Sequence, residues 1–145
     1  MTNPEQRRES MPGESDLAAD GIALNMRFDV DGLYALRSAL LAHGSELGAG
    51  EDDLDRLVLV ASELATNAIR HGGGAGRLRL WRTGDLIFCE VTDTGSGIPD
   101  PDLGVARVEP SAMGGRGLWI CRSLADSLEI AANRPGAKVT AGFSV

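Results

Sequence analysis

The sequence has few of the residues that build metal centres and disulfide frameworks. It contains two histidines and two cysteines, Cys89 and Cys121, which stand 32 positions apart. No CxxC pair occurs, and two histidines cannot complete the spacing of a zinc site. Both cysteines have apolar neighbours, where a free thiol packs as a small hydrophobic group. We therefore expect two reduced core cysteines.

Positive charge and long apolar runs are also scarce. Lys and Arg number 14 against 21 Asp and Glu, giving a formal charge of −7. This balance opposes direct nucleic-acid binding, which needs a clustered positive surface. No run reaches membrane-spanning length, and the charged residues 1–20 lack the apolar stretch of a signal peptide. We expect a cytoplasmic protein without membrane contact.

Several nucleotide-binding and catalytic motifs are missing. There is no GxxxxGK[ST] loop, and the glycine run at 72–76 follows a predicted helix instead of a strand, which argues against a dinucleotide site. Thr94 stands two positions before Ser96, so no nucleophile elbow forms. The glycine loop, lysine and HRD set of protein kinases is absent too. Any phosphoryl transfer here must use a different scaffold.

Length and periodicity predict one folded domain. With 145 residues, 43% of them hydrophobic, the chain can build one core over residues 21–145, preceded by a disordered leader at 1–20. The order of predicted elements favours an α+β two-layer sandwich, in which helices cover one face of a mixed, mostly antiparallel sheet. The elements are a strand at 23–28, a helix from about 30 to 44–48, a helix from 51–54 to about 70, strands at 77–81 and 86–92, a loop at 100–113, a helix opening at 114–117, and strands at 128–131 and 138–143.

Two polar residues interrupt the apolar pattern of the second predicted helix. Glu63 and Asn67 are four positions apart, so they project from the same side one turn apart. Such a pair needs a partner if it is buried, and a hydrated magnesium ion is one, because magnesium prefers oxygen ligands. The neighbouring carboxylate could then deprotonate an attacking hydroxyl. The ordinary alternative is a solvated Glu–Asn pair on the wet side of the helix.

Two glycine segments follow later in the chain. Asp93 ends an apolar strand and precedes Gly95 and Gly97, which permit close approach of a ligand to the backbone. Its carboxylate could accept a hydrogen bond from an exocyclic amine such as that of adenine. An ordinary Asp–Gly turn is the alternative. Residues 114–117 (GGRG) open a helix whose free amides make an anion site, where Arg116 could add a phosphate contact. A flexible hinge before the helix is the alternative there.

Taken together and in this order, the three segments resemble the ATP-site motifs of the GHKL superfamily. The matching phrases are ELATNA at 63–68, DTGSGI at 93–98 and GRGL at 115–118, and residues 98–114 correspond to the ATP lid. The phrases ELATNAIRHG at 63–72 and GGRGLWICRSLAD at 114–126 are most like the anti-sigma-factor serine kinases. The resemblance covers roughly residues 22–145 and implies the Bergerat-type ATP-binding fold.

The resemblance also implies a role for each residue and a set of partners. It implies a protein serine/threonine kinase that binds Mg-ATP and phosphorylates an anti-anti-sigma antagonist. It also implies that the protein binds a sigma factor and so regulates transcription, and that it forms a homodimer around the first strand and helix. A non-catalytic, ATP-dependent partner-switching module is the alternative. By this resemblance, Glu63 is the general base, Asn67 is a magnesium ligand and Asp93 contacts the adenine. Further contacts in the adenine pocket are implied for Gly95, Gly97 and Ile98. Contacts on the phosphate side are implied for Gly115, Arg116, Gly117 and Leu118.

One position departs from the family pattern. Related proteins often carry a threonine in the last hairpin, shortly after the position of Gly136, where it supports the adenine aspartate. Here Ala137 and Lys138 stand in that place, and Thr140 comes two or three positions late. Adenine binding would then depend on water or on another side chain.

Overall fold

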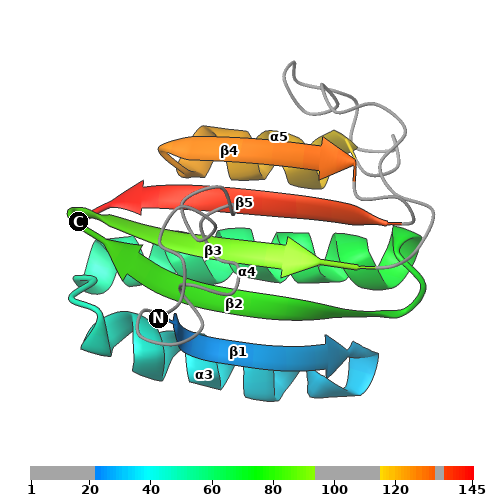
Figure 1. Cartoon of the computed structure of the whole chain (residues 1–145), viewed down its shortest axis with the longest axis horizontal. Helices are drawn as coiled ribbons and strands as arrows, with labels where there is room; N and C mark the ends of the chain where they lie inside the picture. Colours follow the sequence, from blue (N-terminus) through cyan, green and yellow to red (C-terminus); the bar gives the residue numbers. More distant parts are fainter. Residues whose placement is uncertain (1–21, 94–114, 133–135) are drawn as a thin grey trace, which may run out of the picture.

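The computed structural model describes residues 22–93, 115–132 and 136–145. The order of elements is the predicted one, and each predicted helix and strand is confirmed within a few residues (Figure 1). The loop predicted at 100–113 lies outside the described residues. The elements are β1 Ile22–Asp29, the 3-10 turn η1 Val30–Gly32, α3 Leu33–Glu46, α4 Glu51–His71, β2 Ala75–Thr83, β3 Leu86–Thr92, α5 Gly115–Leu124, β4 Ser127–Ala132 and β5 Ala137–Ser144.

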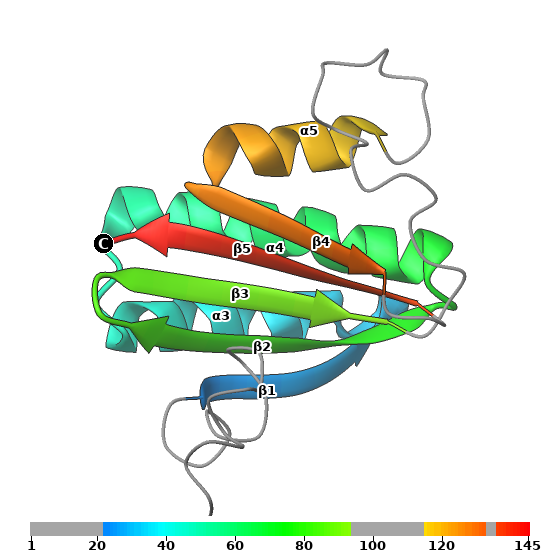
Figure 2. The same cartoon turned by 45° about the horizontal axis from the view of Figure 1, so that its top comes forward.

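The five strands form one sheet in the order β1-β2-β3-β5-β4 (Figures 1 and 2). All four strand pairings are antiparallel. The α+β sandwich is therefore confirmed, and the sheet predicted as mixed has no parallel pair among its described strands. The reason is that β5 lies between β3 and β4. These two strands run in the same direction without touching, and α5 lies in the connection between them.

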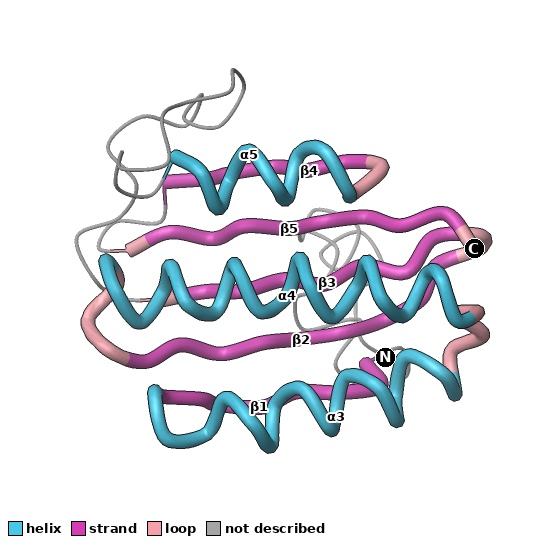
Figure 3. The backbone as a smooth tube through the Cα atoms, turned by 180° about the vertical axis from the view of Figure 1, so that it is seen from behind, coloured by secondary structure: helices cyan, strands magenta, loops and turns pink. Residues whose placement is uncertain are grey.

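The three helices lie on one face of the sheet, with α4 between α3 and α5 (Figure 3). Alternate strand residues point toward this layer, because successive side chains of a strand point to opposite faces. Cys89 of β3 and Cys121 of α5 are free and buried in this core, as expected from the sequence. The strand side chains in the core include Leu78, Leu80, Ile87, Cys89, Val91, Val139, Ala141 and Phe143.

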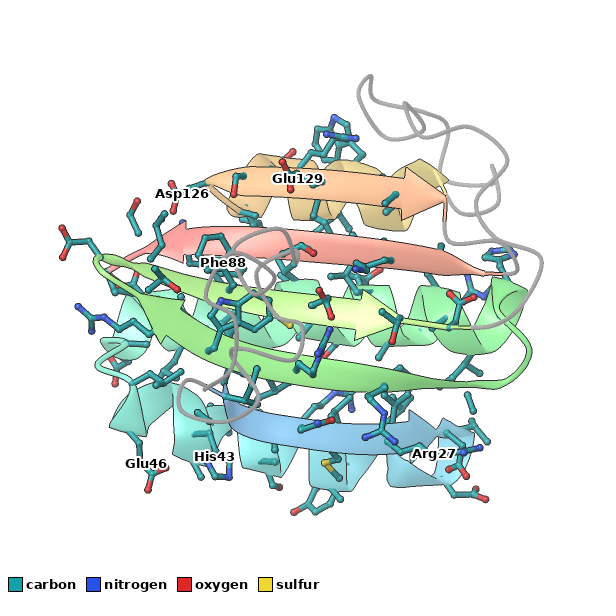
Figure 4. All side chains as sticks on the ribbon, in the orientation of Figure 1. Arg27, His43, Glu46, Phe88, Asp126 and Glu129 are labelled. Carbon is teal, nitrogen blue, oxygen red and sulfur yellow. The ribbon has the colours of Figure 1, made fainter. Side chains whose placement is uncertain are left out.

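The opposite face carries a different set of side chains, and Figure 4 looks onto it, with Phe88 and Glu129 labelled. Trp81 stacks on Phe88 across β2 and β3, with ring centroids 5.5 Å apart. Arg79 pairs with the buried carboxylate of Glu90 between the same two strands. This face therefore takes no part in the contacts between helices that build the candidate site.

Within the described part of the chain, we find no helix with the length and apolar character needed to cross a bilayer.

Candidate functional site

Helix α4 forms one side of the candidate site. An apolar stripe that includes Leu57, Ala61 and Leu64 is buried in the core and fixes the rotation of the helix about its axis. Glu63 and Asn67 lie beside this stripe and are half-buried. Because four residues make about one helical turn, their side chains project from the same side. The predicted pairing of acid and amide on α4 is therefore present.

The first turn of α5 lies directly against this pair. A Cβ added to Gly117 would stand 2.9 Å from Oε1 of Glu63, 3.5 Å from Nδ2 of Asn67 and 3.6 Å from Oδ1 of Asn67. Only glycine leaves the room that these polar atoms need. The structure thus brings Gly117 against two residues that precede it in the sequence by 50 and 54 positions.

The beginning of α5 adds hydrogen-bond donors at the same place. The first four N–H groups of a helix have no partner within the helix, and the helix dipole gives this end a partial positive charge. Gly115 and Arg116 are the first two residues of α5, and Gly117 follows them. An anion can therefore be held by backbone amides beside a carboxylate and an amide side chain.

Asp93 is held at the neighbouring end of the sheet. Its backbone N–H donates to the carbonyl oxygen of Ala137, 3.1 Å away. A Cβ on Gly72 would lie 2.7 Å from Oδ1 of Asp93, so the carboxylate rests against the residue that follows α4. Gly72 is five residues beyond Asn67, about 7.5 Å along a helix axis. The ends of β3 and α4 and the start of α5 lie at the same end of the sandwich (Figure 1). Asp93, which follows β3, is therefore at the end of the sandwich where α5 begins.

The remaining predicted residues fall into two groups. Gly95, Gly97 and Ile98 lie outside the described residues. Leu118 is described, and its side chain is almost completely buried in the hydrophobic core. In this structure Leu118 is a packing residue that holds the first turn of α5 against the sheet.

The last strand holds the backbone of Asp93. The carbonyl oxygen of Ala137 accepts from the Asp93 N–H and continues the antiparallel pairing of β3 with β5. Thr140 pairs with Glu90 and alternates with the core residues Val139 and Ala141, so it lies on the sheet face away from the helices. Thr140 therefore cannot take the place of the missing threonine.

Cys121 of α5 is buried in the core one helical turn beyond Gly117. Its thiol is 3.7 Å from the carbonyl oxygen of Val60 and acts as a weak donor to it. Burial, and secondly the negative charge of Glu63, raise the pKa of the Cys121 thiol to about 12. The Cys121 thiol is therefore neutral near pH 7 and packs as an apolar group of the core.

Sequence reasoning missed the part played by Gly72. In the sequence it reads only as the glycine that ends a helix. In the structure, a Cβ at this position would meet both the Asp93 carboxylate and the Ala68 carbonyl oxygen. The backbone of Gly72 has a φ of −113°, which any residue can adopt, so the requirement comes from close approach. No local pattern reveals such a contact, because Asp93 comes 21 positions later.

The arrangement has a clear chemical capacity. A carboxylate can accept a proton, an amide oxygen can ligate a hard cation, and helix amides can hold phosphate oxygens. Within the described residues there is no group of three or more His, Cys, Asp or Glu side chains that could hold a metal ion alone. A cation bound here would need ligand atoms from a bound anion or from water.

Comparison with known proteins identifies the family of this chain. Residues 26–143 match the family described as the histidine kinase-like ATPase domain, and the chain belongs to that family. No curated protein matches the sequence significantly.

Solved structures with the same fold include kinase catalytic domains. The crystal structure of the RsbU and RsbW domains of Rv1364c from Mycobacterium tuberculosis matches with a TM-score of 0.62 at 19% identity, covering 83% of this chain and 31% of that one. Our chain thus spans about a third of that protein. The catalytic domain of the histidine kinase ThkA matches with a TM-score of 0.53 at 18% identity, covering 83% and 95% of the two chains. The mycobacterial sensor histidine kinase MprB matches with a TM-score of 0.52 at 19% identity, covering 83% and 97%.

Proposed function

We propose that this protein is a magnesium- and ATP-dependent protein serine/threonine kinase of the anti-sigma-factor type. In this proposal it binds Mg-ATP where α4 meets the start of α5, binds a sigma factor, and phosphorylates a serine of an anti-anti-sigma antagonist to regulate transcription. The observation that carries the proposal is the contact of Glu63 and Asn67 with Gly117 at the beginning of α5.

The residues present fit both ATP and magnesium. The free amides at the start of α5 can hold phosphate oxygens. A Cβ on Gly117 would lie 3.6 Å from Oδ1 of Asn67, so a phosphate held by these amides is close to that oxygen. Magnesium often takes few protein ligands and completes its shell with phosphate and water, which suits a site where Asn67 is the protein ligand. Bound there, magnesium would neutralise charge on the phosphates.

Each residue then has a defined task. Glu63 accepts the proton of the incoming serine hydroxyl, and its position against Gly117 keeps it beside the phosphates. Asp93 accepts a hydrogen bond from the adenine amine, with its backbone held by Ala137. Further contacts are proposed for Gly95, Gly97 and Ile98 around the adenine, and for the Arg116 side chain and the backbone amides of Gly115, Gly117 and Leu118 at the phosphates.

The proposed partners are a sigma factor, an anti-anti-sigma antagonist and a second copy of the chain. The first two rest on sequence resemblance, and the third also on exposed apolar side chains. The phrases at 63–72 and 114–126 resemble anti-sigma-factor kinases, and the fold is shared with the structure of the RsbU and RsbW domains of Rv1364c. The homodimer is supported by apolar side chains exposed on η1 and α3. Tyr34 is 81% exposed, Val30 63% and Leu41 47%. Such a group is typical of a surface that another protein covers.

The proposal is tested by incubating the protein with radiolabelled ATP and candidate antagonist proteins. We expect label on a serine of one antagonist, and we expect Glu63→Gln to abolish labelling while nucleotide binding is retained. If every antagonist stays unlabelled although Mg-ATP binds, the kinase assignment is wrong. If Glu63→Gln leaves regulation of the sigma factor unchanged, a non-catalytic partner-switching module accounts for the function instead.

A further inference from the structure

Helices α4 and α5 lie side by side in opposite directions and touch at three levels (Figure 3). At the site, Gly117 meets Glu63 and Asn67. One turn further along α5, the Cys121 thiol meets the carbonyl oxygen of Val60. At the far end, Nη1 of Arg56 donates to the carbonyl oxygen of Leu124, 3.0 Å away. We call these three contacts the α4–α5 seam.

The two helices are in register along this seam. Arg56 and Glu63 are seven residues apart on α4, and Gly117 and Leu124 are seven apart on α5. At about 1.5 Å per residue, both spans are about 10.5 Å. The contact at Leu124 therefore fixes which residue of α5 faces Glu63. A slip by one residue would rotate α5 by about 100° and place a side chain where only Gly117 fits.

Arg56 is itself held from several sides. Nη2 donates to Oδ1 of Asp53 at 2.6 Å, one turn earlier on α4. Its guanidinium lies 3.8 Å from Oδ2 of Asp126 and 5.8 Å from the ring centroid of Phe143. Asp126 in turn accepts from the backbone N–H of Ser144 at 2.7 Å; Figure 4 labels Asp126 beside the start of β4.

These contacts connect the end of α5 to α4 and to β5. The carbonyl of Leu124 is one of the last four of its helix and lacks a partner inside the helix. A guanidinium there also complements the helix dipole. Arg56 is therefore placed to set both the end and the axial position of α5.

We propose that Arg56 is a positioning residue for phosphate binding, which acts by holding α5 in the register that places Gly117 against Glu63 and Asn67. The inference rests on the proposed function, because it assumes that phosphates bind at the start of α5. Arg56 itself stays about 10 Å from the phosphates, since it lies seven residues from Glu63 along α4. Its effect should therefore depend on how many phosphates a ligand has.

The test compares Mg-ATP with AMP by calorimetric titration of the full chain. For Arg56→Met we expect affinity for Mg-ATP to fall at least fivefold more than affinity for AMP, because AMP keeps the adenine contact and lacks the outer phosphates. Arg56→Lys should restore part of the difference, since lysine can still donate to the Leu124 carbonyl. If Arg56→Met weakens binding of both ligands by the same factor, or of neither, the inference is wrong. The proposed function would not be affected by that result, because the unmodified protein would still bind Mg-ATP.

Arg82→Met is the matched control. Like Arg56, Arg82 donates to a backbone carbonyl at the end of a helix, that of Leu47 after α3 at 2.6 Å. It also donates to the carbonyl of Gly84 in the β2–β3 turn at 2.8 Å, and neither contact involves α5. We expect it to change affinity for both ligands by the same factor. A difference as large as that of Arg56→Met would show that any lost arginine has this effect, and the inference would be wrong.

A second measurement needs no ligand. Cys121 lies in the middle of the seam and is buried, so a change in register should expose its thiol. We expect the thiol reagent DTNB to react with Cys121 at least tenfold faster in Arg56→Met than in Arg82→Met, with the labelled residue located by mass spectrometry. Equal rates would contradict a role for Arg56 in register. If the unmodified protein fails to bind Mg-ATP while this difference is found, the proposed function fails and the role in register stands.

Discussion

Gly117 of α5 lies so close to Glu63 of α4 that a Cβ on the glycine would stand 2.9 Å from Oε1 of the carboxylate. Real Cβ atoms do not approach an oxygen this closely, so one of the two groups would have to move. The atom that would move is the end of a flexible side chain, which makes the adjustment cheap for the fold. It is costly for a site in which the position of that carboxylate matters.

Gly117→Ala should therefore separate stability from activity. Alanine favours a helix over glycine by about 1 kcal/mol, so we expect the free energy of unfolding to change by no more than about that amount. Phosphoryl transfer should fall about a hundredfold, because a displacement of about 1 Å can have that effect. Urea denaturation and the radiolabel assay check the two parts. A variant that keeps full activity would contradict the role of Glu63 as base.

Gly72→Ala should act on the fold as well as on the site. The new Cβ would lie 2.6 Å from the Ala68 carbonyl oxygen and would also meet the Asp93 carboxylate. Backbone cannot move aside as a side chain does, so we expect a loss of about 1–3 kcal/mol in the free energy of unfolding.

Gly50→Ala is the control for this substitution. Nothing lies within 4 Å of a Cβ built on Gly50, which precedes α4. We expect a cost of about 1 kcal/mol or less, because glycine is preferred to alanine at a helix N-cap by about that amount and no clash is added. Equal costs for the two variants in urea denaturation would argue against the close contact at Gly72.

Because of the two buried thiols, we expect the free energy of unfolding to fall at alkaline pH. Burial raises the pKa of Cys121 from 9.0 to about 12, and burial raises that of Cys89 further, helped by the neighbouring Cys121 and Glu90. Because the folded pKa values lie above the unfolded ones, the thiols do not lower stability below about pH 8.5. Above that pH the unfolded thiols ionise, and each lowers the free energy of unfolding by up to about 1.4 kcal/mol per pH unit until the folded pKa is reached.

The measurement is urea denaturation between pH 8 and pH 10.5 for the unmodified protein and for Cys89→Ala/Cys121→Ala. The variant will be less stable throughout, since it loses buried volume, but its stability should fall less steeply with pH. Curves that run parallel would mean that the thiols are not kept neutral in the folded protein.

Much of the architecture is visible in the sequence because it rests on local patterns. The apolar stripe of α4, its acidic first turn and the alternation of β2 and β3 each predict an element and its buried side. The pairing of Glu63 with Asn67 follows from helical spacing alone. The antiparallel sheet without a parallel pair is harder, because the insertion of β5 between β3 and β4 is a choice of topology that no local pattern states.

The contacts between distant segments could not be predicted. The restriction on Gly72 comes from Asp93, the hold on Asp93 comes from the carbonyl of Ala137, and the end of α5 is held by Arg56. Each depends on where two elements meet after folding.

The central claim is that the contact between Asn67 and the start of α5 forms a site for magnesium-chelated triphosphate. Calorimetric titration of ATP, with magnesium and then with EDTA, into the unmodified protein and Asn67→Ala tests it most directly. The account predicts one ATP per chain, at least tenfold weaker binding in EDTA, and no such magnesium effect in Asn67→Ala. Absence of binding at millimolar ATP, or an affinity that does not respond to magnesium in the unmodified protein, would contradict it.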